Sequence, residues 1–364
     1  MHTLYGSSIS YYAGKLEAYL RYRGEAYELL PHMPHAAEII EGAGAIQSPV
    51  LRLSDGRWAS DTTPILRWFE SQRANTKGPS IFPDDPALRF VALLLEDHAD
   101  EWLWRPAMHY RWSFLRDREH ASGHLTDEMM PDAPGSRDER RKTVIERQLG
   151  GFVTRDGVDD ETRAHVEATA MAAYDQLEVI LCERPFLLGE RRTIADFGFV
   201  GPMLRHYAQD PTPAELMRRR APKLFTWVAR MWEASPDPAD AALIDTIDQP
   251  LAALLREACE THMIQLRDNA KGFADGASHF DSRIQGCQYT ALPVSRYRVW
   301  CLEELRREWG ELDEGAQATV SPHLTENATA LLSDADPIAR SEYDVEREAP
   351  FNRAINVYGT GVPE

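Results

Sequence analysis

Hydrophobic positions in the first 76 residues alternate between strand-like runs and helical spacing. Residues 2–5 and 26–30 are short apolar runs typical of strands, and residues 15–23 between them carry their apolar side chains on one helical face. Residues 45–69 then predict a short strand, a tight turn at Asp55-Gly56, a second short strand and a helix. This order predicts an α/β domain over residues 1–76, with helices on both sides of a mixed sheet.

Residues 86–235 show repeated helical spacing without convincing strands. A linker rich in Pro, Gly and Asn, residues 73–86, precedes them. Apolar residues at helical spacing run from Val166 to Leu181, whereas the polar stretch 123–141 contains two prolines and predicts an exposed loop. We therefore expect an all-helical second domain over residues 86–235.

The remainder of the chain follows a Pro- and Asp-rich break at residues 236–240. One helical stripe covers residues 243–258 and is interrupted at Pro250, and a second covers residues 299–312. Residues 278–292 lie between them, and their Gly and Tyr content suits a loop or a short strand. We expect residues 239–364 to form a mostly helical extension. The sequence leaves open whether it covers the functional site, extends a dimer interface or binds something else.

Two predicted helix starts combine an acidic residue with a hydroxyl. Asp61, Thr62 and Thr63 are all good N-cap residues, and Pro64 suits the first helical position of the helix that follows. Thr193 and Asp196 have the spacing of a capping box. The free N–H groups of a helix start bind anions, but polar residues there also serve simply as caps. The residues alone leave both interpretations of the Asp61 start open.

The position of Asp61 relative to Ser48-Pro49, with a hairpin between them, adds to this picture. The arrangement resembles the glutathione-binding half of the glutathione transferase N-terminal domain, which has a thioredoxin-like fold. The resemblance implies a cis proline before a strand, whose neighbouring backbone pairs with the cysteinyl part of glutathione. It also implies that an acidic–hydroxyl pair holds the γ-glutamyl end. The implied glutathione-binding residues are Gln47, Ser48, Pro49, Asp61 and Thr62.

The second helix start is similar to another part of the same family. A Leu-Leu-Gly turn at residues 187–189 precedes Thr193 and Asp196, and this setting resembles the buried capping motif of the transferase helical domain. Residues 221–232 also look like the family's late helix. The motif is structural in the family, so Thr193 and Asp196 are not expected in the active site. The resemblance covers about two-thirds of the chain and stops at the extension.

Glutathione transfer requires the cysteinyl sulfur as a thiolate. A free thiol titrates near pH 8.5, and lowering its pKa by about 1–2 units takes roughly 1.4–2.7 kcal/mol, which one hydrogen bond to a charged group provides. Ser10 falls where the serine-type and cysteine-type transferases keep their catalytic residue, so the resemblance implies a serine-type site with catalytic Ser10. Tyr5 falls where the tyrosine-type enzymes keep theirs and remains the alternative, and neither residue acting is the third possibility.

The second substrate is expected in the cleft beside the first helix of the helical domain. Four aromatic residues lie there at helical spacing: Trp102, Trp104, Tyr110 and Trp112. Such spacing is more typical of core packing, but one or two rings that face the cleft would form a site for an apolar electrophile. The sequence does not say which of them do so.

Charge limits the possible partners. The 364-residue chain has 43% apolar residues and a formal net charge of −18, which disfavours nucleic acid and anionic membrane surfaces as partners. Glutathione is itself anionic, so its site needs local cations. Lys15, Arg52 and Arg57 are near enough in sequence to provide them, although each is also typical of an ordinary surface charge.

Cysteine and histidine spacing indicates neither disulfide nor metal chemistry. The four cysteines are scattered without a Cys-x-x-Cys pair, which fits a reducing compartment. The pairs His32/His35 and His120/His124 lack a third ligand nearby, so we expect no metal site. The chain starts without a charged-then-apolar leader, and no apolar run approaches the ~20 residues that span a bilayer. We expect a cytoplasmic protein.

These expectations combine into one leading function and two alternatives. The leading hypothesis is a glutathione transferase that uses glutathione as co-substrate, acts on a small apolar electrophile and forms a homodimer. The first alternative is a non-catalytic binding or scaffold protein that keeps the fold. The second is a glutathione-dependent lyase, ether-cleaving enzyme or isomerase on the same site, and nothing in the residues separates it from the leading hypothesis.

Overall fold

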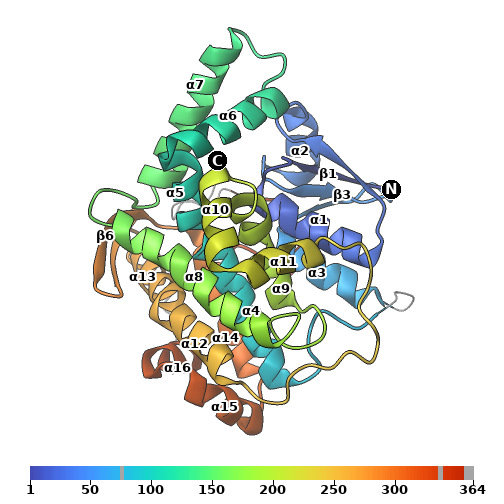
Figure 1. Cartoon of the computed structure of the whole chain (residues 1–364), viewed down its shortest axis with the longest axis vertical. Helices are drawn as coiled ribbons and strands as arrows, with labels where there is room; N and C mark the ends of the chain where they lie inside the picture. Colours follow the sequence, from blue (N-terminus) through green and yellow to red (C-terminus); the bar gives the residue numbers. More distant parts are fainter. Residues whose placement is uncertain (74–77, 335–338, 356–364) are drawn as a thin grey trace.

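The computed structural model describes residues 1–73, 78–334 and 339–355 (Figure 1). The end of the predicted first domain, residues 74–76, and part of the predicted linker lie outside the described residues. The end of the predicted extension, residues 356–364, also lies outside them.

The N-terminal part is built on a four-stranded mixed sheet in the order β2-β1-β3-β4. The strands are β1 (His2–Gly6), β2 (Tyr27–Pro31), β3 (Val50–Arg52) and β4 (Trp58–Ser60). β1 runs parallel to β2 and antiparallel to β3, and β3 is antiparallel to β4. The helices of this part are α1 (Tyr11–Arg23), α2 (Ala36–Ala43) and α3 (Thr62–Ser71). The predicted α/β class and each predicted element are confirmed, and α2 is an additional helix that the sequence analysis did not assign.

The two faces of this sheet have different hydrophobic cores. Leu4 and Leu51 point to the face covered by α1 and α3 and belong to the main core of the molecule. Tyr5 and Val50 are their neighbours in the strands and point the other way, because side chains alternate along a strand. They form a small separate core with Ile39 of α2. Helices therefore cover both sides of the sheet, as predicted.

Helices alone make up the described part of the chain between the sheet and the extension. They are α4 (Pro86–Glu101), α5 (Trp104–Ser113), α6 (Leu115–Met129), α7 (Arg137–Gln148), η2 (Leu149–Thr154), α8 (Arg163–Glu183), α9 (Ile194–Pro202), η3 (Met203–Tyr207), α10 (Pro211–Arg220) and α11 (Pro222–Met231). α4 and α9 pack closely at the centre, where a Cβ on Gly198 would lie 2.7 Å from the Cα of Glu96. The predicted all-helical region is confirmed.

The predicted loop at residues 123–141 is wrong. α6 continues to Met129 and α7 begins at Arg137, so only residues 130–136 connect them. Figure 1 shows the two helices projecting at the upper end of the molecule. Their polar faces meet solvent, which explains the weak apolar stripe in the sequence. The two prolines lie in the connection, and Ser136 with Glu139 forms a capping box at the start of α7.

The extension is mostly helical, as predicted, and also contains a β-hairpin. Its elements are α12 (Gln249–Glu260), α13 (His262–Ala274), β5 (His279–Ile284), β6 (Cys287–Pro293), α14 (Arg296–Gly310), α15 (Glu314–Val320), η4 (Ser321–His323) and α16 (Glu326–Ser333). Pro250 lies in the first turn of α12 and does not interrupt it, since Asp248 caps that helix by accepting from the N–H of Leu251 at 3.0 Å.

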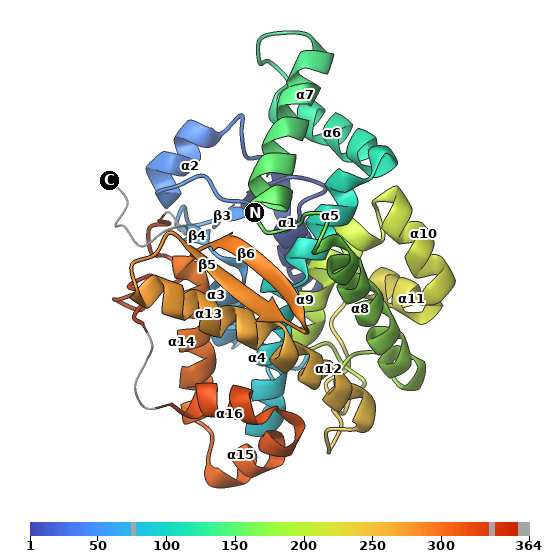
Figure 2. The same cartoon turned by 90° about the vertical axis from the view of Figure 1, so that its left-hand side faces the viewer.

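Several helices of the extension pack against the rest of the chain (Figure 2). α12 and α14 lie on α4, and α12 also contacts α8. Val299 and Leu302 of α14 belong to the same hydrophobic core as the helical domain. Arg67 of α3 forms an ion pair with Glu308 of α14 at 2.7 Å. The extension is thus an integral part of the molecule.

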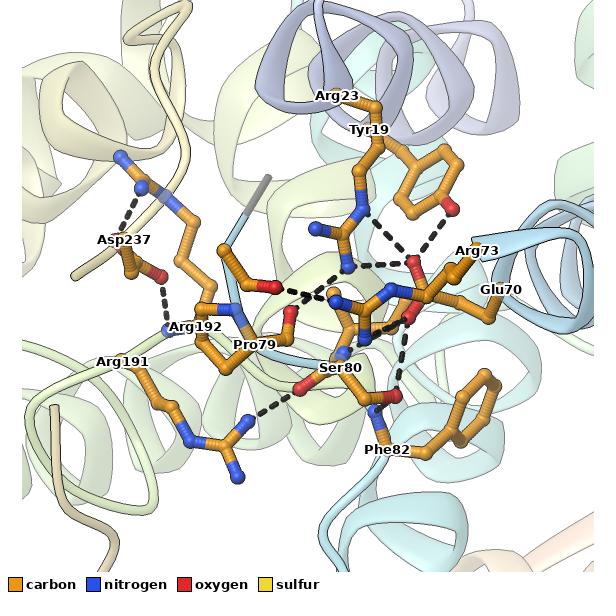
Figure 3. A network of polar contacts seen from close by, with 12 residues as sticks. Tyr19, Arg23, Glu70, Arg73, Pro79, Ser80, Phe82, Arg191, Arg192 and Asp237 are labelled. Carbon is orange, nitrogen blue, oxygen red and sulfur yellow. Dashed lines mark hydrogen bonds and ion pairs between the residues drawn. The ribbon is translucent and has the colours of Figure 1, made fainter. Parts of the chain in front are cut away.

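Buried Glu70 of α3 joins the sheet domain to the helical domain (Figure 3). Its Oε1 accepts from Tyr19 at 2.7 Å and from Arg23 at 2.8 Å, both in α1. Its Oε2 accepts from the hydroxyl of Ser80 at 3.0 Å, in the segment that leads to α4. Arg191, just before α9, donates to the carbonyl of Ser80. One buried carboxylate therefore fixes the relative position of α1, α3 and the helical domain.

Within the described ranges, no helix combines the length and apolar character needed to cross a membrane. The four cysteines are free, and two of them are fully buried.

Candidate active site

A cavity of about 410 Å³ opens between the sheet domain, the helices α4 and α5, and the extension. Every residue predicted to bind glutathione or activate its thiol at the serine position lines this cavity: Ser10, Gln47, Ser48, Pro49, Asp61 and Thr62. Tyr5, the alternative catalytic residue, lies elsewhere. It is 2% exposed in the small core beneath α2 and stacks on Trp58 with ring centroids 5.4 Å apart.

Ser10 is the N-cap of α1, and its Oγ accepts from the N–H of Ala13 at 3.4 Å. The Oγ atoms of Ser10 and Ser48 are 3.2 Å apart, and either hydroxyl can donate to the other. Ser48 precedes Pro49 through a cis peptide bond, as the resemblance implied. The hydroxyl of Ser10 therefore lies at the positive end of α1 and on the cavity wall. It is beside the loop that contains Ser48 and Pro49, called the proline loop below.

The loop before Ser10 is held by side chains of the helical domain. Ser7 donates to Glu128 of α6 at 2.6 Å, and the backbone N–H of Ser8 donates to the same carboxylate at 3.2 Å. Arg111 of α5 donates to the carbonyl of Ile9 at 2.7 Å and pairs with buried Asp210 at 2.8 Å. The hydroxyls of Ser7 and Ser8 both donate to Glu128. Ser7 and Ser10 both line the cavity, but among the described residues the Ser10 hydroxyl is not bonded to a carboxylate.

Asp61 begins α3 in an unusual way. Its φ is 71°, a region that non-glycine residues rarely occupy, and its carboxylate makes no capping bond to the helix. The N–H groups in the first turn of α3 thus keep their hydrogen-bonding capacity beside the cavity. Oδ1 of Asp61 accepts from the hydroxyl of Tyr297 at 3.1 Å, while Oδ2 is buried without a hydrogen-bond partner.

Further carboxylates surround Asp61. Lys15 is fully buried and donates to Glu96 and Asp100 of α4, and its Nζ also lies 3.1 Å from the hydroxyl of Thr63. Asp100 lines the cavity and has one buried oxygen without a partner. Burial raises the pKa of Asp61 to about 7, although Lys15 and the Tyr297 hydrogen bond lower it. Burial also raises the pKa of Asp100. This end of the cavity therefore has two carboxyl groups with an unpartnered oxygen each, whose ionised forms a bound cation would favour.

Part of the cavity lining is apolar. Of the four predicted aromatic residues, Trp104 and Trp112 line it, whereas Trp102 and Tyr110 do not. Trp102 is buried against Tyr289 of the extension, and Tyr110 stacks on Phe114. The remaining apolar lining is contributed by Ile9, Met33, Ile46, Met108, Leu125 and Phe152. The prediction that one or two of these rings face the cleft agrees with the structure.

The expected local cations are wrong. Lys15 is enclosed by carboxylates, Arg52 pairs with Glu38 at 2.8 Å and Arg57 pairs with Asp55 at 2.8 Å. None of the three lines the cavity. The arginines that do are Arg111, Arg147 and Arg298. Sequence proximity was misleading because the lining cations come from α5, α7 and α14, far along the chain from the proline loop.

Four lining residues come from the extension and were missed by the sequence analysis: Ser295, Tyr297, Arg298 and Tyr343. Arg298 lies 3.3 Å from the carboxylate of Glu101, which also lines the cavity. The helical stripe of residues 299–312 predicted α14, but no local pattern indicated that its first turn would reach Asp61. That contact joins positions 236 residues apart.

The second helix start lies outside the cavity. Thr193 and Asp196 are fully buried at the beginning of α9, and neither belongs to the cavity lining. The Asp196 carboxylate accepts from the N–H of Thr193 at 2.8 Å, which is the capping arrangement predicted from the sequence. Elsewhere, no three His, Cys, Asp or Glu side chains of the described residues gather as the ligands of a metal ion would.

Comparisons with known proteins agree with this fold. The profile of the glutathione S-transferase N-terminal domain matches residues 4–77, and that of the glutathione S-transferase C-terminal domain matches residues 103–234. No curated protein sequence gives a significant match.

Three solved structures illustrate the structural similarity. β-Etherase LigF from Sphingobium sp. strain SYK-6 is 18% identical, with 63% of this chain and 94% of that chain covered and a TM-score of 0.44. A glutathione S-transferase from Rhodospirillum rubrum F11 is 17% identical, with 70% and 92% covered and a TM-score of 0.42. CsGST63524 of Ceriporiopsis subvermispora, in complex with glutathione, is 18% identical, with 65% and 98% covered and a TM-score of 0.44.

The two domain profiles occur one after the other and together span more than half of the chain. They coincide with the mixed sheet and with the helices that follow it. The chain therefore belongs to the glutathione S-transferase family.

Proposed function

We propose that this protein is a glutathione transferase, which binds glutathione as co-substrate along Ser10, Gln47, Ser48, Pro49, Asp61 and Thr62. In this proposal it transfers the thiolate to a small apolar electrophile. The observation that carries the proposal is the start of α3, where an unpartnered carboxylate oxygen lies beside N–H groups that no side chain caps.

The γ-glutamyl end of glutathione fits these two features together, because it carries an ammonium and a carboxylate on one carbon. The ammonium would donate to Oδ2 of Asp61, in the region where Asp100 has another buried oxygen without a partner. The carboxylate would accept from the first-turn N–H groups of α3 at Thr62, aided by the helix dipole. A ligand with only one of these charges would leave either the Asp61 carboxylate or the N–H groups of α3 without a partner.

Ser10 is suited to stabilise the thiolate. If Ser48 donates across the 3.2 Å contact, the proton of Ser10 is free to point at the sulfur. A hydrogen bond to a thiolate contributes about 1.5–3 kcal/mol, and the N-terminus of α1 favours the same negative charge. The resulting lower thiol pKa increases the thiolate fraction at neutral pH.

The second substrate would bind against Trp104, Trp112 and their apolar neighbours. In the reaction the thiolate attacks the electrophilic carbon, a carbon–sulfur bond forms, and the leaving group departs with the electron pair of its former bond. Apolar walls favour such a substrate through burial of its surface, at about 25 cal/mol per Å².

Calorimetric titration of glutathione into the full-length protein tests this proposal, followed by product analysis with an aryl halide. Binding in the micromolar to millimolar range together with a thioether product would support a transferase. Binding without any product would favour a scaffold protein, and cleavage or isomerisation of other substrate classes would favour a lyase, ether-cleaving enzyme or isomerase. Absence of binding would reject the glutathione site.

We also propose that the protein is cytoplasmic, is a homodimer and has three structural parts at residues 1–76, 86–235 and 239–364. The extension packs on α3 and α4 of its own chain, so a second copy must use surface that the extension leaves open. Light scattering at micromolar concentration tests the dimer, which a monomeric mass would contradict.

A further inference from the structure

We infer that the extension forms one wall of the glutathione site, and that Tyr297 is a positioning residue which orients the Asp61 carboxylate toward the γ-glutamyl ammonium. This inference rests on the proposed function and adds a residue from outside the two matched domains. Tyr297 is not placed in direct contact with glutathione, and its role is exerted through Asp61.

The contact between Tyr297 and Asp61 is specific. In the described part of the chain, the Tyr297 hydroxyl is the only hydrogen-bond donor to the Asp61 side chain, at 3.1 Å from Oδ1. The bond occupies one carboxylate oxygen and leaves Oδ2 without a partner. A carboxylate anchored by one oxygen has its second oxygen in a fixed direction, which is the arrangement needed to receive a charged donor.

The position of Tyr297 on α14 strengthens this effect. Ser295 is the N-cap of α14 and lines the cavity, so Tyr297 lies in the first turn of that helix. The positive end of the α14 dipole thus faces the Asp61 region and favours the ionised carboxylate. The rings of Trp300 and Tyr343 pack on Tyr297, with centroids 5.4 Å and 5.3 Å away, and restrict its orientation.

Residues near the C-terminal end of the described chain also hold the backbone next to Asp61, where β4 leads into α3. The N–H of Ser60, the residue before Asp61, donates to the carbonyl of Pro350 at 3.0 Å. Phe351 packs on Trp68 of α3 with ring centroids 5.4 Å apart, and the N–H of Ala354 donates to the carbonyl of Ala43 at 2.8 Å. Asp61 is therefore fixed by the extension at both its side chain and its adjoining backbone.

This arrangement has a consequence for the charge on Asp61. Burial favours the neutral carboxyl, as do the nearby carboxylates Glu96 and Glu101, whereas Lys15 and the Tyr297 hydrogen bond favour the ionised form. Loss of the Tyr297 hydroxyl would raise the pKa of Asp61 further and release its orientation. Glutathione binding would then need a higher pH, while a ligand without the ammonium would be unaffected.

Calorimetry on the full-length protein with Tyr297→Phe tests the inference, using glutathione and its des-amino analogue glutaryl-cysteinyl-glycine between pH 6 and 8. The matched control is Tyr27→Phe, since the Tyr27 hydroxyl also donates to a carboxylate, Glu17 at 3.0 Å, outside the cavity lining. We expect Tyr297→Phe to weaken glutathione binding roughly three- to tenfold at pH 6.5, with a smaller loss at pH 8, because a hydrogen bond to a charged group is lost. The control should match the wild type.

The outcomes separate the inference from the proposed function. The inference is supported if the wild type binds glutathione and Tyr297→Phe lowers that affinity in a pH-dependent way. The affinity for the des-amino analogue should then be the same in both proteins. Equal loss for both ligands at every pH indicates only a structural role and overturns it, as does an unchanged affinity for glutathione. If the wild type does not bind glutathione, the proposed function itself fails. Should Tyr297→Phe unfold, Tyr297→Gln restores a donor and is expected to keep the wild-type pH profile.

Discussion

The two acidic helix starts of this protein have similar residues and opposite surroundings. At the start of α9, Asp196 accepts four hydrogen bonds: from the N–H of Leu187, the N–H and hydroxyl of Thr193, and the indole of Trp227. At the start of α3, Asp61 accepts one, from Tyr297, and keeps a buried oxygen unpaired. Both oxygens of the Asp196 carboxylate are hydrogen-bonded within the described residues, whereas only one oxygen of the Asp61 carboxylate is.

The same electrostatic cost applies to both carboxylates. Burial raises the pKa of Asp196 to about 6 and that of Asp61 to about 7. In Asp196 the protein's own donors offset much of the cost of burying the charge, whereas Asp61 has a single donor in the described part of the chain, the Tyr297 hydroxyl. A carboxylate at a helix start therefore has a structural role when the protein itself provides its hydrogen-bond donors. It is a candidate binding site when an oxygen is left without a donor.

Removing Asp196 should give the largest effect. Asp196→Ala leaves the N–H groups of Leu187 and Thr193 and the indole of Trp227 buried without an acceptor, so we expect a loss of roughly 3–5 kcal/mol in the free energy of unfolding. Urea denaturation measures this loss.

Asp61→Asn is the matched control at pH 8. The folded-state pKa of Asp61, about 7, lies above its usual value, so stability falls as pH rises through that range and the ionised carboxylate destabilises the empty protein. The amide removes this cost, so Asp61→Asn should be at least as stable as the wild type. Equal destabilisation by both substitutions would contradict the contrast between the two helix starts.

Ser10→Ala should lower turnover by about ten- to a hundredfold, the equivalent of one hydrogen bond to a charged group, if chemistry limits the rate. Glutathione affinity should remain nearly unchanged, because the other predicted residues still hold the tripeptide. The ultraviolet absorbance of the bound thiolate between pH 6 and 9 should show a raised thiol pKa. Tyr5→Phe is the comparison: an unchanged titration in Ser10→Ala with a shift in Tyr5→Phe would move the role to Tyr5.

Asp61→Ala should weaken glutathione binding by more than tenfold, or at least about 1.4 kcal/mol, because the ammonium loses its charged partner. Calorimetry at pH 7.5 measures the change. An affinity within a factor of two of the wild type would mean that Asp61 does not hold the γ-glutamyl end.

The smallest expected effect is the pH dependence of the wild type. Binding of the ammonium requires ionised Asp61, which is surrounded by Lys15, Glu96, Glu101 and Tyr297. Since the pKa of Asp61 is about 7, glutathione affinity should fall roughly five- to tenfold as pH drops from 7.5 to 6, with proton release on binding. A flat profile over this range, measured by calorimetry in two buffers, would contradict the role of Asp61.

Local sequence patterns were sufficient for the helix starts and the main domain order. Asp61-Thr62 and Thr193–Asp196 mark real N-termini, because residue preferences at a helix start depend on residues within one turn. Asp61 nevertheless makes no capping bond, and Pro64 is the third residue of α3 rather than the first. Two similar signals were overlooked, namely Ser136 with Glu139 before α7 and Asp248 before Pro250 in α12. The prolines near both helix starts were interpreted as breaks in a helix. In both places a polar side chain caps the helix that follows, and proline is tolerated in or before its first turn.

Contacts between distant segments were beyond the sequence. Nothing near Tyr297 indicates that its hydroxyl meets Asp61, because the packing of α14 on α4 determines that contact. The same holds for Lys15, which local sequence placed near an anion site but which the fold encloses between Glu96 and Asp100. Candidate site residues on the sheet domain followed from the resemblance to the family, whereas their charge environment depends on tertiary structure.

A crystal structure of the full-length protein with glutathione tests the central claim most directly. The account predicts that the γ-glutamyl ammonium lies within hydrogen-bond distance, about 3 Å, of Oδ2 of Asp61, with Tyr297 still on Oδ1. It also predicts the carboxylate over the N–H groups at Thr62 and the sulfur within reach of the Ser10 hydroxyl. Glutathione bound elsewhere, or bound in the cavity with Oδ2 of Asp61 still unpaired, would contradict it.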